Sequence, residues 1–216
     1  PFLIACWKVA PALAAGNSVV LKPASLTPLT ALSLGLLAQE AGLPDGVLQV
    51  LPGSGYEAGN ALATHPLIRK IGFTGSTEVG TKIMKLAADD IKRVSLELGG
   101  KSPNIVFADA DWQRAALESP MSVFANTGQD CCARSRMFIE QSIFDDFVSQ
   151  FVAATEKLNI GNPLLDETQI GPMVSSAQRE LSESFIAEAK GDGRNILTDG
   201  ERLSGSGFYL KPAVIT

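Results

Sequence analysis

A polar, glycine-containing loop contains the chemically most reactive type of side chain in this sequence, the cysteine thiol. Residues 126–134 read NTGQDCCAR, so the thiols of Cys131 and Cys132 lie outside any apolar run. A free cysteine is more often an inert core residue than a nucleophile, but core cysteines are uncommon in polar loops. A thiolate here would attack an electrophilic carbon such as that of a carbonyl group. Cys131 is therefore a candidate nucleophile.

A second candidate group is the carboxylate of Glu97, which ends an apolar run. Residues 94–103 read VSLELGGKSP, so two glycines follow the glutamate closely. Taken alone, a glutamate at a strand end is usually a solvated residue at the rim of a sheet. Beside a nucleophilic thiol, a carboxylate would instead offer a general base. The two segments are more informative together than singly.

Two glycine-rich turns could approach a phosphorylated ligand. The first, Gly53-Ser-Gly55-Tyr-Glu-Ala-Gly59, is one residue too long for the dinucleotide pattern G-x-G-x-x-G, and a plain tight turn explains it better. The second reads FTGSTEVG over residues 73–80. Its glycines let the backbone approach a ligand, and Ser76 with free amide groups at a helix start could hold a pyrophosphate. The second turn is the better phosphate site.

The elements that must position these groups alternate between helices and strands. Helices are predicted over residues 2–15 (buried), 27–42 (with Thr27 as N-cap and Pro28 in the first turn), 57–64 and 77–88, and strands over 18–21, 47–51, 69–73 and 93–96. Apolar strands separated by helices favour a parallel sheet covered on both faces. Residues 1–98 are therefore predicted to form a doubly wound, Rossmann-like coenzyme domain of an α/β protein.

The pattern of predicted strands and helices changes after Gly99 and Gly100, which predicts part of a second α/β domain over residues 99–216. It should contain strands at 104–107 and 135–140, helices from about 112 to 125, 143–158 and 175–190, a glycine-rich turn at 205–207 and a short final strand. The thiol loop would then belong to this catalytic domain, while Glu97 would end the first.

Composition excludes several classes of function. With 45% hydrophobic and 19% charged residues and a net charge of -5, the 216-residue chain is typical of a globular protein without a basic surface for nucleic acid. The apolar stretch from residue 2 to 21 is interrupted by Lys8, Pro11 and Asn17, so it should not cross a membrane. Three cysteines without framework spacing favour a reducing compartment, by default the cytoplasm.

Five segments together resemble one enzyme superfamily, the NAD(P)-dependent aldehyde dehydrogenases. They read IACWK, VVLKP, FTGSTEVG, LELGGKSPNIVFADAD and GQDCCARSR, in the family's order and spacing over essentially the whole chain. The resemblance implies that Cys131 is the nucleophile and that Glu97, 34 residues earlier (131 - 97), is the general base. Cys132 occupies a position that varies in the family.

The resemblance also implies a mechanism. The thiolate adds to the aldehyde, the resulting oxyanion is stabilised partly by the amide N–H of Cys131, and hydride passes to nicotinamide. A water molecule deprotonated by Glu97 then hydrolyses the thioester to a carboxylic acid. Partial burial of Glu97 would raise its pKa toward neutrality, which suits this role.

The family resemblance also implies which residues contact the coenzyme. The resemblance implies that Lys22 lies at the adenosine ribose, that Gly55 and Gly59 line the adenosine side, and that Leu98 and Gly99 lie by the nicotinamide. The pyrophosphate would be held by residues of the second turn, namely Phe73, Thr74, Gly75, Ser76, Thr77, Val79 and Gly80.

Ser25 departs from the family pattern, because many NAD-preferring members have a glutamate there that binds the ribose hydroxyls. A glutamate would repel a 2'-phosphate, whereas a serine with Lys22 nearby need not. The sequence thus predicts that NADP is tolerated or preferred, with NAD as the alternative coenzyme.

The family's oxyanion-hole asparagine and its nicotinamide-ribose segment are expected outside residues 1–216, so the chain is interpreted as a central fragment that is inactive alone. The full-length protein is expected to be a homo-oligomer acting on a small aldehyde, and Arg134 favours amino or other polar aldehydes. Lys8 matches a family lysine near the base, where a proton relay or a structural role is equally open.

Several functions besides aldehyde oxidation fit the residues alone. His65 could pair with Cys131 in a cysteine hydrolase, although a surface role at a helix end explains it better. No metal is expected, because adjacent cysteines and one histidine lack zinc-ligand spacing. A dinucleotide-binding scaffold without turnover and a CoA-acylating aldehyde dehydrogenase also stay open. An acylating enzyme would not require Glu97 as a hydrolytic base.

Overall fold

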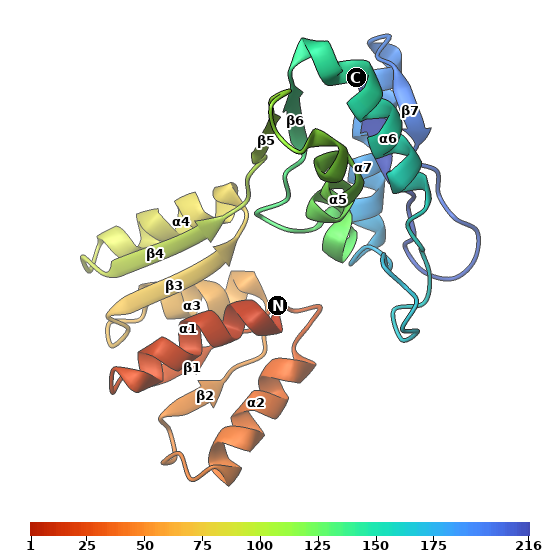
Figure 1. Cartoon of the computed structure of the whole chain (residues 1–216). Coiled ribbons are helices and arrows are strands. Elements are labelled where there is room, and N and C mark those ends of the chain that lie inside the picture. The colour runs from red at the N-terminus through yellow and green to blue at the C-terminus, as the bar shows by residue number, and fades with distance from the viewer. The chain divides into compact units, whose positions relative to one another are not determined.

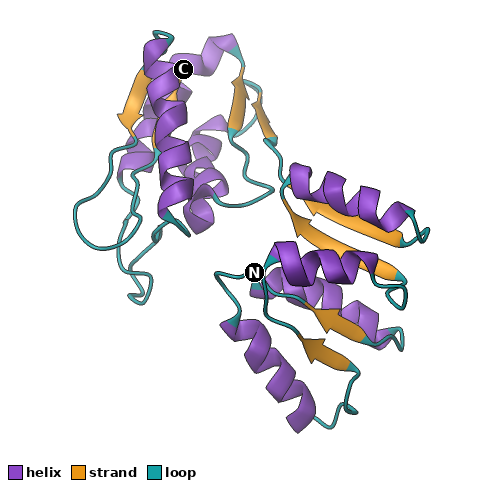
Figure 2. Ribbon diagram, turned by 180° about the vertical axis from the view of Figure 1, so that it is seen from behind, coloured by secondary structure: helices purple, strands orange, loops and turns teal.

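The computed structural model describes all residues, 1–216, and divides them into two compact units. Unit 1 comprises Pro1–Leu98 and unit 2 comprises Gly99–Thr216. Both units combine helices with short strands, as Figure 2 shows in purple and orange. The protein is therefore of the α/β class, with parallel strand pairing in each unit.

Unit 1 alternates helices and strands along the chain, as predicted. Its elements are α1 (Phe2–Ala14), β1 (Val19–Leu21), α2 (Leu29–Glu40), β2 (Leu48–Val50), a π-helical turn (Gly55–Gly59), α3 (Asn60–Thr64), β3 (Lys70–Gly75), α4 (Thr77–Ala88) and β4 (Arg93–Leu98). Figure 1 shows β3 and β4 side by side with α4 next to them, and β1 beside β2.

The strands of unit 1 form two parallel ladders. Val19 of β1 pairs with Leu48 of β2, and β3 pairs with β4 along its full length, ending at Gly75 opposite Leu98. Each connection between paired strands includes a helix, which is the usual crossover in parallel pairing because the chain must return to the end at which the first strand began. The carboxyl ends of β3 and β4 consequently lie next to each other.

Two details of unit 1 differ from the prediction. Thr27 does not cap α2, because its amide donates to Ala24 O and closes a turn, while its buried hydroxyl makes no hydrogen bond. The first helix is also not buried as a whole. Only Val9 of α1 is fully buried, because α1 packs on one side against β1 and α2, and Trp7 is 62% exposed.

Unit 2 contains the remaining elements. They are β5 (Pro103–Val106), α5 (Trp112–Phe124), a 3-10 turn (Ala125–Gly128), β6 (Arg136–Ile139), a 3-10 turn (Gln141–Ile143), α6 (Phe144–Glu156), α7 (Ser176–Gly191), β7 (Ile196–Asp199) and β8 (Ala213–Ile215). Strands β5 and β6 pair in parallel. Strand β7 was not predicted, and it pairs with β8 in antiparallel fashion.

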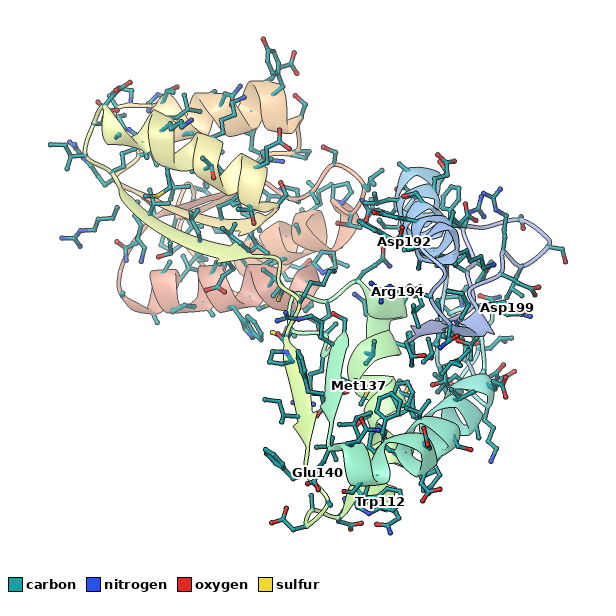
Figure 3. All side chains as sticks on the ribbon, turned by 90° about the horizontal axis from the view of Figure 1, so that it is seen from above. Trp112, Met137, Glu140, Asp192, Arg194 and Asp199 are labelled. Carbon is teal, nitrogen blue, oxygen red and sulfur yellow. The ribbon has the colours of Figure 1, made fainter.

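The core of unit 2 lies where α5 and α6 pack against the β5–β6 ladder. Its buried members are Val106, Ala116, Ile143, Phe147 and Phe151. Trp112 of α5 and Met137 of β6 pack against them, and both are labelled in Figure 3. The rings of Phe147 and Phe151 stack with centroids 6.3 Å apart. This core fixes α5, whose C-terminal end leads directly into the thiol loop.

A smaller buried cluster in unit 2 consists of Met173, Ile186 and Leu210. It joins α7 to the loop between α6 and α7, through Met173, and to the segment before β8, through Leu210. None of the helices combines the length with the apolar composition that a membrane span requires.

Candidate active site

The thiol loop begins with an unusual backbone. Asn126, Thr127 and Gly128 have φ angles of 51°, 59° and 68°, so three consecutive residues are left-handed. Glycine adopts this conformation freely, asparagine tolerates it, and a β-branched threonine adopts it at a cost. The chain thereby turns sharply after α5 and leads into residues 129–134, of which Asp130, Cys131, Cys132 and Arg134 are exposed and Ala133 is buried.

Cys131 is exposed, and its amide N–H donates no hydrogen bond within the chain. The neighbouring amides are engaged: Cys132 N donates to Asp130 Oδ1 at 3.0 Å, and Ala133 N donates to Asp130 O at 3.2 Å. An N–H group that is free beside a thiol can donate to an oxyanion formed on that thiol's adduct. The loop therefore places an exposed thiol next to one unengaged N–H donor.

The thiol of Cys131 lies 3.7 Å from the thiol of Cys132. This hydrogen bond, followed by partial burial and the negative charge of Cys132 and Asp130, raises the pKa of Cys131 above its ordinary value. The thiolate is thus disfavoured by the local surroundings in unit 2, contrary to what an activated nucleophile needs. The sulfurs and the Asp130 carboxylate lie within 4.8 Å of one another, but their adjacent spacing is not that of a structural zinc site.

The backbone of Cys131 approaches the glycine pair that follows β4. A Cβ atom on Gly100 would lie 3.3 Å from the carbonyl oxygen of Cys131, tighter than ordinary contact, whereas a Cβ on Gly99 would meet nothing within 4 Å. The absence of a side chain at Gly100 therefore permits this approach. The sequence pattern Gly99-Gly100 alone did not reveal which glycine matters.

Glu97 lies in β4, paired with Thr74 of β3. Residues alternate along β4, so Val94, Leu96 and Leu98 are half-buried and Glu97 falls on the other face. Its side chain is exposed in unit 1, so the predicted partial burial of Glu97 is not found there. The structure does bring Glu97 next to the glycine-rich turn that follows β3.

That turn leads into α4 through Ser76. The hydroxyl of Ser76 accepts a hydrogen bond from Val79 N at 3.3 Å, so Ser76 is the N-cap of the helix. The first amides of a helix have no partner within it, and Thr77 N remains available to an anion together with the Ser76 O–H. Gly80 is buried, and a Cβ atom added there would lie only 2.8 Å from Leu98 Cδ2. Turn, helix start and Leu98 are thus packed together.

The remaining predicted residues of this turn lie at its edge. Phe73 is half-buried, with its ring folded over Gly75 so that a Cβ at Gly75 would clash with it, and Thr74 and Val79 are exposed. Nothing larger than glycine fits at position 75 without moving the ring.

A cleft of about 360 Å³ lies between the chain after β1 and the chain after β2, and Ser25 is the predicted coenzyme contact that lines it. The cleft is lined by Pro23, Ala24, Ser25, Pro28, Pro52, Gly53 and Ser54. Lys22 Nζ donates to Pro23 O at 2.7 Å and to Gly53 O at 3.3 Å, and Ser25 Oγ donates to Gly53 O at 3.3 Å. The prolines and Ser54 were not predicted, although Gly53 and Ser54 lie in the first glycine-rich turn.

The surroundings of this cleft suit a nucleoside. Gly59 lies beside the Lys22 side chain, where a Cβ would come within 3.9 Å, and Gly55 has open space around it. The Lys82 ammonium lies 5.7 Å from the centre of the Tyr56 ring, which links the turn after β2 to α4. Unit 1 therefore contains a cleft beside the half-buried Lys22, a helix start with an unengaged amide at Thr77 and the exposed Glu97 carboxylate, groups that could contact a dinucleotide.

Two other predicted residues have local roles. His65 is exposed at the end of α3, and its Nδ1 atom accepts a hydrogen bond from Leu67 N at 3.2 Å. This bond gives the histidine a local role at the end of its helix. The aliphatic stem of Lys8 packs beside Gly72 of β3, where a Cβ would lie 3.6 Å from it.

Comparison with known proteins gives a consistent result. A family model described as the aldehyde dehydrogenase family matches residues 1–216. The peroxisomal aminoaldehyde dehydrogenase 2 of Pisum sativum is 47% identical over 218 residues, which cover 100% of this chain and 43% of the pea protein. The chain thus spans less than half the length of this relative.

Solved structures of aldehyde dehydrogenases are also similar to this chain. An indole-3-acetaldehyde dehydrogenase complexed with NAD+ superposes with a TM-score of 0.97 at 44% identity, covering 100% of this chain and 44% of that chain. The betaine aldehyde dehydrogenase of Staphylococcus aureus in complex with NAD+ gives a TM-score of 0.95 at 38% identity, with 100% and 43% covered.

Proposed function

The chain belongs to the aldehyde dehydrogenase family, and we propose that the polypeptide containing it oxidises an aldehyde to a carboxylic acid with NAD(P)+ through a thioester on Cys131. The observation that carries this proposal is the exposed Cys131 thiol beside its own unengaged amide N–H. In this proposal, residues 1–98 form the coenzyme-binding domain and residues 99–216 belong to the catalytic domain.

The first step is addition of the Cys131 thiolate to the aldehyde carbon. A C–S bond forms, the carbonyl π electrons move to oxygen, and the oxyanion accepts a hydrogen bond from Cys131 N. NAD(P)+, when bound, supplies the acceptor for the hydride that leaves this carbon. Because loss of hydride leaves a thioester on sulfur, Cys131 holds the acyl group until water releases it.

Glu97 is proposed as the base for that release. Its carboxylate takes a proton from water as the water oxygen attacks the thioester carbon, and the Cys131 sulfur leaves. The order and spacing of the segments LELGGKSP and GQDCCARSR, which resemble the family's base and nucleophile segments, support this pairing.

The coenzyme is proposed to lie along unit 1. Adenosine would occupy the cleft beside Ser25 and Lys22, with Gly55 and Gly59 on its side. The pyrophosphate would accept hydrogen bonds from Ser76 Oγ and Thr77 N, while Leu98 and Gly99 would lie by the nicotinamide. The structural neighbours bound to NAD+ support NAD as coenzyme.

Tolerance of NADP is proposed from Ser25 and Lys22. Ser25 places no negative charge at the cleft, and the Lys22 ammonium already lies within 3.3 Å of Gly53 O at its edge. A 2'-phosphate would therefore meet a cation and a hydroxyl donor rather than a carboxylate. A kcat/KM for NADP at least comparable with that for NAD is expected, and a strong preference for NAD would overturn this part of the proposal.

Three free cysteines suit a reducing compartment, such as the cytoplasm. A homo-oligomer is the assembly proposed for the full-length protein. Substrates with amino or other polar groups are proposed from Arg134 near the thiol loop. The pea relative and the staphylococcal structure are named for an aminoaldehyde and for betaine aldehyde.

The proposal is tested by expressing the complete reading frame and following NADH and NADPH formation over an aldehyde panel. Cys131→Ser should abolish turnover, and Cys6→Ser, which removes a half-buried thiol of α1, should leave it intact. Retained turnover in Cys131→Ser, or no oxidation of any aldehyde by the folded wild-type protein, would contradict the proposed function.

A further inference from the structure

The backbone before Cys131 requires support from outside the loop. Thr127 has φ 59° between Asn126 and Gly128, which are also left-handed. A β-branched residue is rare in this region, because its side chain crowds the neighbouring backbone. Such a conformation persists only where surrounding contacts fix it.

Two long-range hydrogen bonds provide that support within unit 2. The Thr127 hydroxyl donates to Gly171 O at 3.1 Å, and Val174 N donates to the Gln129 side-chain oxygen at 3.1 Å. They span 44 and 45 positions of sequence. Both connect the turn before the thiol to the single segment 171–174.

The segment 171–174 is itself firmly held. Ile170 is 2% exposed and Met173 is 8% exposed. The carbonyl oxygen of Ile170 accepts from Gly161 N at 3.0 Å, and Met173 N donates to Phe208 O at 3.0 Å. A backbone fixed on both sides and anchored by buried side chains is a rigid platform for the two bonds.

Hydrogen bonds between residues close in sequence connect this fixed turn to the Cys131 thiol. Gln129 N donates to Asn126 O, and Asn126 Nδ2 donates to Gln129 O, both at 3.1 Å. Asp130 then accepts from Cys132 N, and the Cys132 thiol lies against that of Cys131. The orientation of the reactive sulfur thus depends on a turn that Thr127 and Gln129 hold in place.

We infer that Thr127 and Gln129 are positioning residues, which clasp segment 171–174 and thereby fix the direction in which the Cys131 thiol and its amide N–H point. Their effect on turnover rests on the proposed function. Their effect on loop order and on the reactivity of the thiol does not, so the two can be tested apart.

The test compares Thr127→Val with Thr127→Ser. Valine keeps the β-branched shape and the backbone crowding but removes the hydroxyl, whereas serine keeps the hydroxyl. Hydrogen exchange should quicken roughly threefold to tenfold at Gln129 N and Ala133 N in Thr127→Val, the population ratio expected for one lost hydrogen bond. Thr127→Ser should exchange like the wild type.

The Cys131 thiol supplies a second readout that global destabilisation would not move. Its alkylation rate, measured by mass spectrometry against pH, should shift to lower pH in Thr127→Val, because loosening the loop weakens its contact with Cys132. Thr198→Val is the control in the same unit, since it removes two hydrogen bonds outside the loop: Thr198 Oγ1 donates to Pro212 O at 3.0 Å and accepts from Val214 N at 2.8 Å. It should leave both readouts unchanged.

Gln129→Met is a second variant, which removes the acceptor of Val174 N and should reproduce the effects of Thr127→Val if the latter folds poorly. In a catalytically competent protein, both variants should lower kcat several-fold with little change in the KM for aldehyde. Wild-type exchange and alkylation in both variants, or equal changes in Thr198→Val or Thr127→Ser, would overturn the inference. Failure of the wild type to oxidise aldehydes would overturn only the proposed function.

Discussion

Replacement of Gly100 by alanine tests the approach of the glycine pair to the thiol loop. The new Cβ would lie 3.3 Å from Cys131 O, so the carbonyl must move by a few tenths of an ångström. Displacing a reacting group by about 1 Å costs roughly a hundredfold in rate. A shift of about 0.3 Å therefore corresponds to roughly a fourfold loss in kcat, on a logarithmic scale.

Stability should change far less than activity. Gly100 does not have a left-handed φ, so alanine reduces the entropy of the unfolded chain and stabilises by about 0.4–1 kcal/mol. Crowding against the Cys131 carbonyl offsets part of this gain, and the net change should stay within about 1 kcal/mol.

The assay combines kcat at saturating aldehyde with urea unfolding. Gly191→Ala is the control, because a Cβ at Gly191 in α7 meets nothing within 4 Å. It should leave kcat unchanged. Turnover of Gly100→Ala at the wild-type rate, or equally slow turnover of Gly191→Ala, would refute a role for this close approach in catalysis.

Three further variants test separate features of the site and the core. Cys132→Ala removes the largest cause of the raised pKa of Cys131, so that pKa should fall and alkylation of Cys131 should reach its maximal rate at a lower pH; an unchanged profile would show that Cys132 has no influence. Ser25→Glu adds a carboxylate at the adenosine cleft and should lower kcat/KM for NADP at least tenfold relative to NAD, whereas an unaltered ratio would remove Ser25 from the coenzyme site. Phe147→Ala, at a side chain that is 0% exposed, should destabilise unit 2 by about 3–5 kcal/mol in urea unfolding, and a change under 1 kcal/mol would mean that this core does not support the unit.

Local pattern predicted most of the fold. Helix α4 has the predicted bounds Thr77–Ala88, because its N-cap Ser76 and its apolar spacing are both local signals. Parallel pairing followed from apolar strands separated by helices. Strand β7 was missed, since its pairing with β8 depends on chain more than ten residues away.

For the candidate site too, local features could be predicted from the sequence, whereas contacts between remote segments could not. Residue types and spacing predicted Cys131, Glu97 and the turn at Ser76 as site residues, which stays a prediction, and register in the β3–β4 ladder places Glu97 next to the start of that turn. Sequence could not reveal the contacts of Thr127 with Gly171 or of Gly100 with the Cys131 carbonyl, because both join segments remote in sequence. The burial expected for Glu97 failed because the exposed face of β4 carries it.

The central claim is that one sulfur carries the acyl group and one carboxylate releases it. Glu97→Gln in the complete protein, mixed with aldehyde and NAD, measures this most directly. We predict a burst of about one NADH per active site, an acyl mass on the Cys131 peptide and steady turnover at least roughly a hundredfold slower. Wild-type turnover in Glu97→Gln, or a burst with the acyl group on another residue, would contradict the account.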